Sequence, residues 1–311
     1  ISTYQTDKYW IAEGSKGLRS IQRKGSNSFE ALNEPIILDG PYSNSAFDIV
    51  CKNDKVYMII GGKDLLNGKR FDKGGYILTY DYDKWSFIDP KEAQKKLNLP
   101  RNPRDYTSIA VTTDDSNDEI VYASSMGDGV IQYKNGTPVQ SYNEKNAFKE
   151  TAGGYGSGYC YIDGLAFDKN GNLWMTSSEV NHAVLVLDKA GAWHRLDIEQ
   201  LRGVYTINDI LITSTNDKWI YVPRNTPKLV MIPNSESLDE VSSYEFTTLI
   251  DTDGKELTPS NYTCVAEDKD GYIWVGTNRG AVYFTKPRIS SAEDKAATRC
   301  TRVKYTNEET G

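Results

Sequence analysis

Five polar residues precede a recurring aromatic residue and are the best candidates for binding chemistry in the chain. Four of them lie 9 to 11 residues before their aromatic residue, and the fifth takes the corresponding place in its own repeat. The five are Asp48, Thr107, Asp163, Asp209 and Thr263, and the aromatic residues that follow them are Tyr57, Tyr122, Trp174, Trp219 and Trp274. Their regular placement predicts a ring of carboxylates and hydroxyls at one rim of a repetitive structure.

Such a ring has two interpretations. Converging carboxylates could hold a cation, a sugar hydroxyl or a basic side chain of a partner. Alternatively, each residue could cap backbone amides where a strand begins, as Asp and Thr often do. Both interpretations stay open from the sequence, and the five residues are predicted here as a ligand-binding rim.

Composition excludes several classes of function. The chain has 36 basic and 43 acidic residues in 311, which gives a net charge of −7 and no basic stripe for nucleic acid. It contains only two histidines, His182 and His194, which leaves little for a zinc site or a histidine-based triad. No apolar run is long enough for a membrane helix. We therefore expect no catalytic residue, no metal and no cofactor, with a lyase or hydrolase as the alternative class.

The aromatic residues belong to short β-type runs that repeat along the chain. Six runs centre on Trp10, Tyr57, Tyr122, Trp174, Trp219 and Trp274, spaced 47, 65, 52, 45 and 55 residues apart. Most have a β-type segment before them and one or two after them. Four short antiparallel strands repeating at about 50 residues are typical of β-propeller blades.

The repeat predicts an all-β fold, a β-propeller of six to seven four-stranded blades, with a β-sandwich as the alternative. We expect one domain over 1–311, with units at about 1–43, 44–104, 105–159, 160–205, 206–259 and 260–311. The first unit lacks a visible first strand. The chain is therefore expected to close at six blades by strand exchange, or to be an incomplete ring cut from a longer protein.

Local signals complete these expectations. Asp89 and Pro90 predict the start of a short helix over 90–97, which accounts for the 65-residue interval. The turns at 168–172 and 268–272 resemble the start of a calcium loop but lack its late glutamate, so we expect tight turns. Of the four cysteines, none forms a C-x-x-C pair, and buried free thiols are expected rather than two disulfides.

The best-formed repeat carries a family resemblance. The segment 268–283 reads DKDGYIWVGTNRGAVY and resembles the two-component regulator propeller repeat of Bacteroidota proteins. Residues 168–176 resemble the first half of that repeat, and residues 9–18 its second half.

Two groups of proteins use this repeat. A chain with one good copy among degenerate ones resembles the PorZ-like accessory proteins of the type IX secretion system. That resemblance implies a non-enzymatic, exported scaffold at the periplasm or outer-membrane surface of a Gram-negative bacterium. Its partner would be an envelope protein or a surface glycan or lipopolysaccharide. The alternative is a periplasmic oligosaccharide-sensing propeller of a hybrid two-component system.

Overall fold

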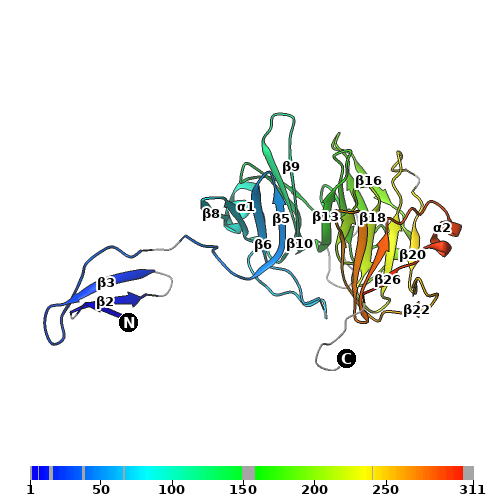
Figure 1. The fold of residues 1–311 in the computed structure, drawn as a ribbon. Helices are drawn as coiled ribbons and strands as arrows, with labels where there is room; N and C mark the ends of the chain where they lie inside the picture. The colour runs from blue at the N-terminus through cyan, green and yellow to red at the C-terminus, as the bar shows by residue number, and fades with distance from the viewer. Residues whose placement is uncertain are drawn as a thin grey trace, which may run out of the picture.

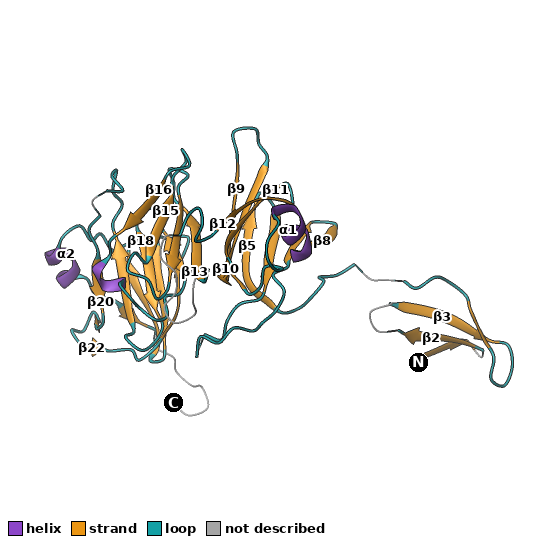
Figure 2. Cartoon of the chain, turned by 180° about the vertical axis from the view of Figure 1, so that it is seen from behind, coloured by secondary structure: helices purple, strands orange, loops and turns teal. Residues whose placement is uncertain are grey.

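The chain is almost entirely antiparallel β-structure (Figures 1 and 2). The computed structural model describes residues 2–5, 7–13, 17–36, 39–65, 67–148, 158–239 and 241–303. Within these residues, six groups of four consecutive strands form antiparallel units, which we call blades 1 to 6. Met126 and Gly127 of blade 3 also pair with Tyr161 and Cys160 of blade 4, which joins these two blades into one eight-stranded sheet. No helix in these ranges is both long and apolar enough to cross a bilayer.

The blades follow one another in chain order. Blade 1 contains β1 (Ser2–Gln5), β2 (Lys8–Ala12), β3 (Leu18–Arg23) and β4 (Phe29–Ala31). Blade 2 contains β5 (Ala46–Lys52), β6 (Lys55–Ile60), β7 (Ile77–Asp81) and β8 (Lys84–Ile88). Blade 3 contains β9 (Tyr106–Thr113), β10 (Glu119–Gly127), β11 (Gly129–Lys134) and β12 (Thr137–Tyr142).

The second half of the chain repeats this plan. Blade 4 contains β13 (Cys160–Phe167), β14 (Leu173–Ser177), β15 (Val184–Leu187) and β16 (Trp193–Leu196). Blade 5 contains β17 (Ile210–Ile212), β18 (Lys218–Val222), β19 (Lys228–Ile232) and β20 (Tyr244–Phe246). Blade 6 contains β23 (Tyr262–Glu267), β24 (Tyr272–Thr277), β25 (Gly280–Thr285) and β26 (Thr301–Arg302).

Only short elements lie outside the blades. They are the helices α1 (Pro90–Leu97) and α2 (Ala292–Ala297), the 3₁₀ turn Glu199–Leu201, and the hairpin of β21 (Leu249–Ile250) and β22 (Glu256–Leu257). Helix α1 begins as the sequence predicts, because Asp89 accepts a hydrogen bond from the Lys91 amide and Pro90 occupies its first turn.

The predicted propeller fold is confirmed, and its core lies between the blades. In blades 2 to 5 the aromatic residue at the centre of the second strand points toward the following blade, and we call that side of each sheet the aromatic face. The next residue along the strand points toward the preceding blade, on the receiving face. Trp174 of blade 4 thus packs on Ile220 and Val230 of blade 5, and Trp219 of blade 5 packs on Val275 and Val282 of blade 6.

The same contact joins the earlier blades. Tyr57 of blade 2 packs with Ile109 and Ile131 of blade 3, and Tyr122 of blade 3 packs with Met175 of blade 4. All four aromatic side chains are nine-tenths or more buried. Because the sheets of blades 3 to 5 are covered by their neighbours on both faces, β-strands with little polar alternation are stable here.

Blade 1 lies apart from the other five (Figures 1 and 2). Contrary to expectation it has a first strand, β1, which pairs with β2 through Ser2 and Trp10 and through Thr3 and Tyr9. The sequence missed β1 because its four residues, STYQ, lack an apolar pattern. Closure at six blades by strand exchange is not seen in the described residues, since each blade uses strands that are consecutive in the chain.

The two D-x-x-G segments are tight turns. Asp168 accepts hydrogen bonds from the amides of Asn170 and Asn172 and from the indole N–H of Trp174, at 2.9, 2.8 and 2.9 Å. Gly171 supplies the left-handed conformation that the turn needs, with φ of 84°. Asp268 repeats the same three bonds in blade 6. The aspartate therefore fixes the turn and orients the core tryptophan, rather than binding calcium.

The cysteines are all free thiols, but only half of them are buried. Cys160 and Cys300 lie in interblade cores, whereas Cys51 and Cys264 are exposed. The expectation of buried thiols was wrong for Cys51 and Cys264. These two residues lie on sheet faces that no neighbouring blade covers among the described residues.

Replacing Trp219 tests the interblade core. We expect Trp219→Ala to lower the free energy of unfolding by about 3–5 kcal/mol, because it leaves a cavity between two sheets that cannot collapse. Urea denaturation followed by circular dichroism measures this loss. Tyr82, 65% exposed in the turn between β7 and β8, is the control. Tyr82→Ala should change stability by less than about 0.5 kcal/mol, and similar losses in both variants would contradict this picture.

Candidate binding site at the inner edge

Blades 2 to 6 form an arc, and their first strands lie side by side along its inner edge. Strands β5, β9, β13, β17 and β23 each contact the next one in the series. The five residues predicted as a rim all lie on or just before these strands. The structure therefore gathers them on one edge, but it divides them into two sets.

The division comes from strand register. The first-strand partners of the five aromatic residues are Val50, Ala110, Ala166, Leu211 and Ala266. The first set comprises Asp48, Ser108, Gly164, Asp209 and Cys264, which lie two residues before these partners. The second set comprises Thr107, Asp163 and Thr263, which lie one residue earlier, beside irregularities in the strand pairing. A shift of one residue turns a side chain to the opposite face of a strand.

The first set links successive blades. The Ile109 amide donates to Asp48 Oδ2, and the Leu165 amide donates to Ser108 Oγ, both at 3.2 Å. Gly164 occupies the next equivalent position, where a Cβ atom would lie 2.8 Å from Asp209 Oδ1. The absence of a side chain at Gly164 thus lets the Asp209 carboxylate lie against the backbone of blade 4.

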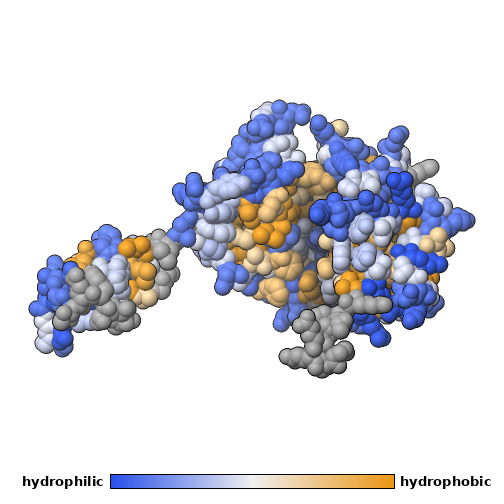
Figure 3. All heavy atoms as spheres, in the orientation of Figure 1, coloured by the Kyte–Doolittle hydropathy of each residue, from blue (hydrophilic) through white to orange (hydrophobic). Residues whose placement is uncertain are grey.

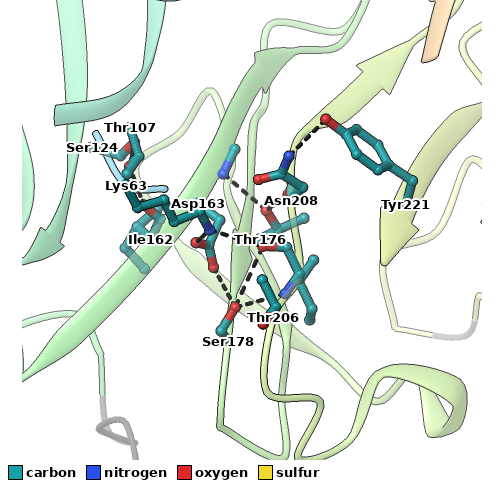
Figure 4. A network of polar contacts seen from close by, with 12 residues as sticks. Lys63, Thr107, Ser124, Ile162, Asp163, Thr176, Ser178, Thr206, Asn208 and Tyr221 are labelled. Carbon is teal, nitrogen blue, oxygen red and sulfur yellow. Dashed lines mark hydrogen bonds and ion pairs between the residues drawn. The ribbon is translucent and has the colours of Figure 1, made fainter. Parts of the chain in front are cut away.

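Two residues of the second set, Thr107 and Asp163, belong to a buried polar network (Figure 4). Lys63 Nζ forms an ion pair with Asp163 Oδ1, and the Ser178 hydroxyl donates to Asp163 Oδ2 at 2.6 Å. Lys63 and Asp163 each expose only 3% of their side chains. Thr107 donates to the Ile162 carbonyl at 2.6 Å. Asp163 and Thr107 are therefore already satisfied within the protein, by side chains and a backbone carbonyl rather than by the backbone amides of the capping interpretation.

Lys63 reaches this network from a long connection in blade 2. The segment between β6 and β7 extends toward blades 4 and 5, where Lys63 also donates to the Ile207 carbonyl at 3.3 Å. A small cavity of about 20 Å³ beside the ion pair is lined by Lys63, Asp163, Ser178 and Glu179, among others. The connection therefore fastens three blades together at the inner edge.

Of the three acids in the predicted rim, Asp163 is paired with Lys63, whereas Asp48 and Asp209 form no ion pair with a described residue. Asp209 has solvent-accessible surface at the inner edge, but protein atoms of the surrounding blades crowd its carboxyl group and reduce its hydration. This burial, together with the nearby charge of Asp48, raises the pKa of Asp209 to about 7, and Lys63 opposes the rise. Burial also raises the pKa of Asp48, while hydrogen bonds from Ile49, Ile109 and Ser108 lower it. The two carboxyls thus repel one another when both are ionised.

This pair can accept hydrogen bonds from a basic side chain or a hydroxyl group. In the described part of the chain, no three histidine, cysteine or acidic groups lie close enough together to hold a metal ion. Thr263, on the exposed first strand of blade 6, contributes its backbone carbonyl to a hydrogen bond from Tyr221 at 3.2 Å. As a binding site, the five-residue rim stays a prediction, and the geometry concentrates it on Asp48 and Asp209.

Neither histidine lies on this edge. His194 is in the outer strand β16, where its Nε2 contacts Asp188 Oδ2 at 2.8 Å, and His182 lies in the bend before β15. The sequence analysis missed Lys63 and Ser178. The unusual length of the β6–β7 connection was a visible signal for Lys63, but nothing in the sequence identified its partner.

Comparisons with known proteins agree with this fold. Residues 256–279 match the two-component regulator propeller family. PorZ of Porphyromonas gingivalis, described as an essential bacterial surface component of the type IX secretion system, has a similar structure. It superposes with a TM-score of 0.74 at 19% identity, over 99% of this chain and 41% of the PorZ chain. This chain therefore spans about two fifths of PorZ. No curated protein matches it.

Other similar structures are looser. A protein from Lactobacillus plantarum superposes with a TM-score of 0.51 at 10% identity, over 96% of this chain and 81% of that one. The extracellular domain of a one-component system protein from Bacteroides thetaiotaomicron gives 0.37 at 14% identity, over 96% and 40%, which is too loose to carry an argument. The chain thus contains a two-component regulator propeller repeat and shares its overall fold with PorZ.

The buried ion pair predicts a large loss when one partner is removed. We expect Lys63→Met to lower the free energy of unfolding by about 3–5 kcal/mol, because Asp163 would stay buried without a counter-charge. The double variant Lys63→Met/Asp163→Asn should lose less than the two single variants together. Urea denaturation of all four proteins measures the coupling, and additive losses would show that the pair does not act as a unit.

The raised pKa of Asp209 predicts a pH dependence with a defined sign. Between pH 4 and 7 the folded state binds more protons at this group than the unfolded chain does, so stability falls as pH rises. Asp209→Asn removes that fall, and its stability relative to the parent should increase from pH 4 to 7 and then level off. Urea denaturation across this range measures the effect. The exposed Asp115→Asn should run parallel to the parent, and a parallel Asp209→Asn curve would refute the assignment.

Proposed function

We propose that the chain is part of a non-enzymatic, exported binding and scaffolding propeller that serves type IX protein secretion at the cell envelope. The observation that carries this proposal is the superposition on PorZ over 99% of the chain. The repeat family matches only residues 256–279, although six blades are present, which fits a protein with degenerate copies of the repeat. Because 41% of PorZ is spanned, the activity of the whole protein is part of the proposal.

The inner edge supports a binding role. Asp48 and Asp209 present carboxyl oxygens without a basic partner, whereas Lys63 already neutralises Asp163. A pair of acids repels phosphate and other anionic groups, so this edge does not suit the charged part of a lipopolysaccharide. A lysine or arginine side chain of an envelope protein fits better, because a buried or half-buried acid gains a strong, charge-assisted hydrogen bond from it.

Catalysis is not supported by the groups on this edge. Lys63 is held in an ion pair, and both histidines lie on outer segments rather than at the inner edge. A hydrolase or lyase would need a base and an acid within reach of one substrate atom. The second candidate is an oligosaccharide-sensing propeller of a two-component system, which the repeat match at residues 256–279 favours.

Deletion of the gene in its host separates the two candidates. If the chain serves secretion, its loss should leave type IX cargo in the cell, detected by immunoblotting of cell and medium fractions. If it is a sensor, secretion should stay normal and the transcriptional response to an oligosaccharide should disappear. The second result would overturn the proposal.

The same host tests the inner edge. Complementation with Asp48→Asn/Asp209→Asn should restore protein level but not cargo secretion, because the amides no longer attract a basic partner. We expect secreted cargo to fall roughly tenfold, as loss of one charge-assisted hydrogen bond implies. The matched control is Asp115→Asn/Asp253→Asn, at two exposed acids. Full secretion by the inner-edge variant would exclude this pair as the contact.

A further inference from the structure

Two sheet faces of the five-blade arc lack the neighbour that every other face has. Each interblade core joins the aromatic face of one blade to the receiving face of the next. Among the described residues, no such core joins blade 6 to blade 2. The aromatic face of blade 6 and the receiving face of blade 2 are therefore uncovered.

The uncovered receiving face of blade 2 is apolar. The cross-strand row on this face is Ile49, Met58, Leu78 and Phe87. Ile49 is 57% exposed, whereas its equivalent in blade 3, Ile109, is 1% exposed. Phe87 at the outer end of the row is 49% exposed, but Leu78 at its centre is 1% exposed. Figure 3 shows apolar residues gathered over the region of β5 and β6. Tyr42 covers part of the face, where its ring lies 4.7 Å from those of Tyr76 and Phe87.

The aromatic face of blade 6 is also open. Its central row is Ala266, Trp274 and Tyr283, and Ala266 is exposed while Trp274 and Tyr283 are half-buried. The equivalent residues of blade 5, Trp219 and Met231, are 1% and 0% exposed. Trp274 nevertheless keeps the hydrogen bond to Asp268 that orients it toward a following blade, at 2.7 Å. The two faces are thus the two halves of one repeated interface.

Blade 1 does not fit the aromatic face of blade 6. At the central receiving position of the third strand, blades 2 to 6 carry Leu78, Ile131, Leu185, Val230 and Val282. Blade 1 has Arg19 there, paired with Ile11 on the second strand and in an ion pair with Glu13 at 3.2 Å. Docking this face on Trp274 would bury that ion pair in an apolar core, which is unfavourable.

We propose that the receiving face of blade 2 and the aromatic face of blade 6 are docking surfaces for one or more further four-stranded blades, supplied by polypeptide outside residues 1–311, that complete this ring. The occupant is defined by its chemistry. The sheet that packs on Trp274 has an aliphatic residue at the position where blade 1 has Arg19. The sheet that packs on Ile49 contributes its aromatic face. The proposal continues an interface that the chain already forms four times, and it does not depend on the role in secretion.

The two exposed thiols report on the two faces. Cys51 lies two residues from Ile49 on the receiving face of blade 2, and Cys264 lies two residues from Ala266 on the aromatic face of blade 6. Cys160 and Cys300 are buried and serve as internal controls. The experiment treats envelopes of the natural host, and separately the 311-residue chain, with a polyethylene-glycol maleimide, and counts labelled thiols by gel shift before and after unfolding.

We expect Cys51 and Cys264 to label in the 311-residue chain and to be protected in the natural protein until it is unfolded. Equal, rapid labelling in both would overturn the proposal. Protection in the 311-residue chain that increases with concentration would assign the faces to a second copy instead. Protection that is independent of concentration would assign them to blade 1. Either result would also overturn the proposal.

A second measurement does not require the shorter chain to fold. In the natural protein, Ile49→Asp and Ala281→Asp should each lower the melting temperature by several degrees, because each would place a charge in an interblade core. The controls Tyr82→Asp and Lys269→Asp change residues that are exposed in turns of the same two sheets. If all four variants melt together, the two faces are open to solvent and the proposal is wrong.

Discussion

The fold depends on one repeated contact, in which an aromatic side chain from the second strand of a blade packs on the next blade. A four-stranded sheet of this size cannot bury both of its faces alone, so each blade is stable only between two neighbours. Trp174 and Trp219 show the contact in its complete form, with nearly full burial and apolar partners from the following sheet. The turn aspartates Asp168 and Asp268 are part of it, because each holds the indole nitrogen of its tryptophan in the direction of the next blade.

That constraint decides what the inner edge can be. Because packing between blades fixes the five first strands side by side, polar residues at their starts are brought together whatever their role. Some are then used by the structure itself. Asp163 is neutralised by Lys63 from blade 2 and bonded by Ser178, so it joins blades rather than facing a ligand. Asp48 and Asp209 have no basic partner, and their mutual repulsion is what keeps them receptive to a cation.

The sequence predicted the repeat because the residues that are buried between blades recur at a regular spacing. The aromatic residue, the flanking strands, the D-x-x-G turns and the helix at Pro90–Leu97 all depend on local residues, and the structure confirms them. The rim was harder to predict, because register shifts beside Thr107, Asp163 and Thr263 move these side chains by one position without a sequence signal. The Lys63 contact was out of reach, since it joins residues 100 positions apart through a connection with no repeat. The open faces fit the expected alternative of an incomplete ring, but the strand patterns did not show which blades lack neighbours.

The position of the two candidate binding acids follows from the differences between the repeats. Gly164 stands where blades 2 and 5 carry Asp48 and Asp209, and a side chain at Gly164 would collide with the Asp209 carboxylate. An acid at position 164 is therefore sterically excluded, and with it a complete carboxylate ring of the kind that could enclose a metal ion. What remains is an asymmetric pair on two blades that are not adjacent, with Lys63 and Asp163 beside it. An asymmetric arrangement of this kind suits one extended group entering from one direction, which is how a side chain of a protein partner would approach.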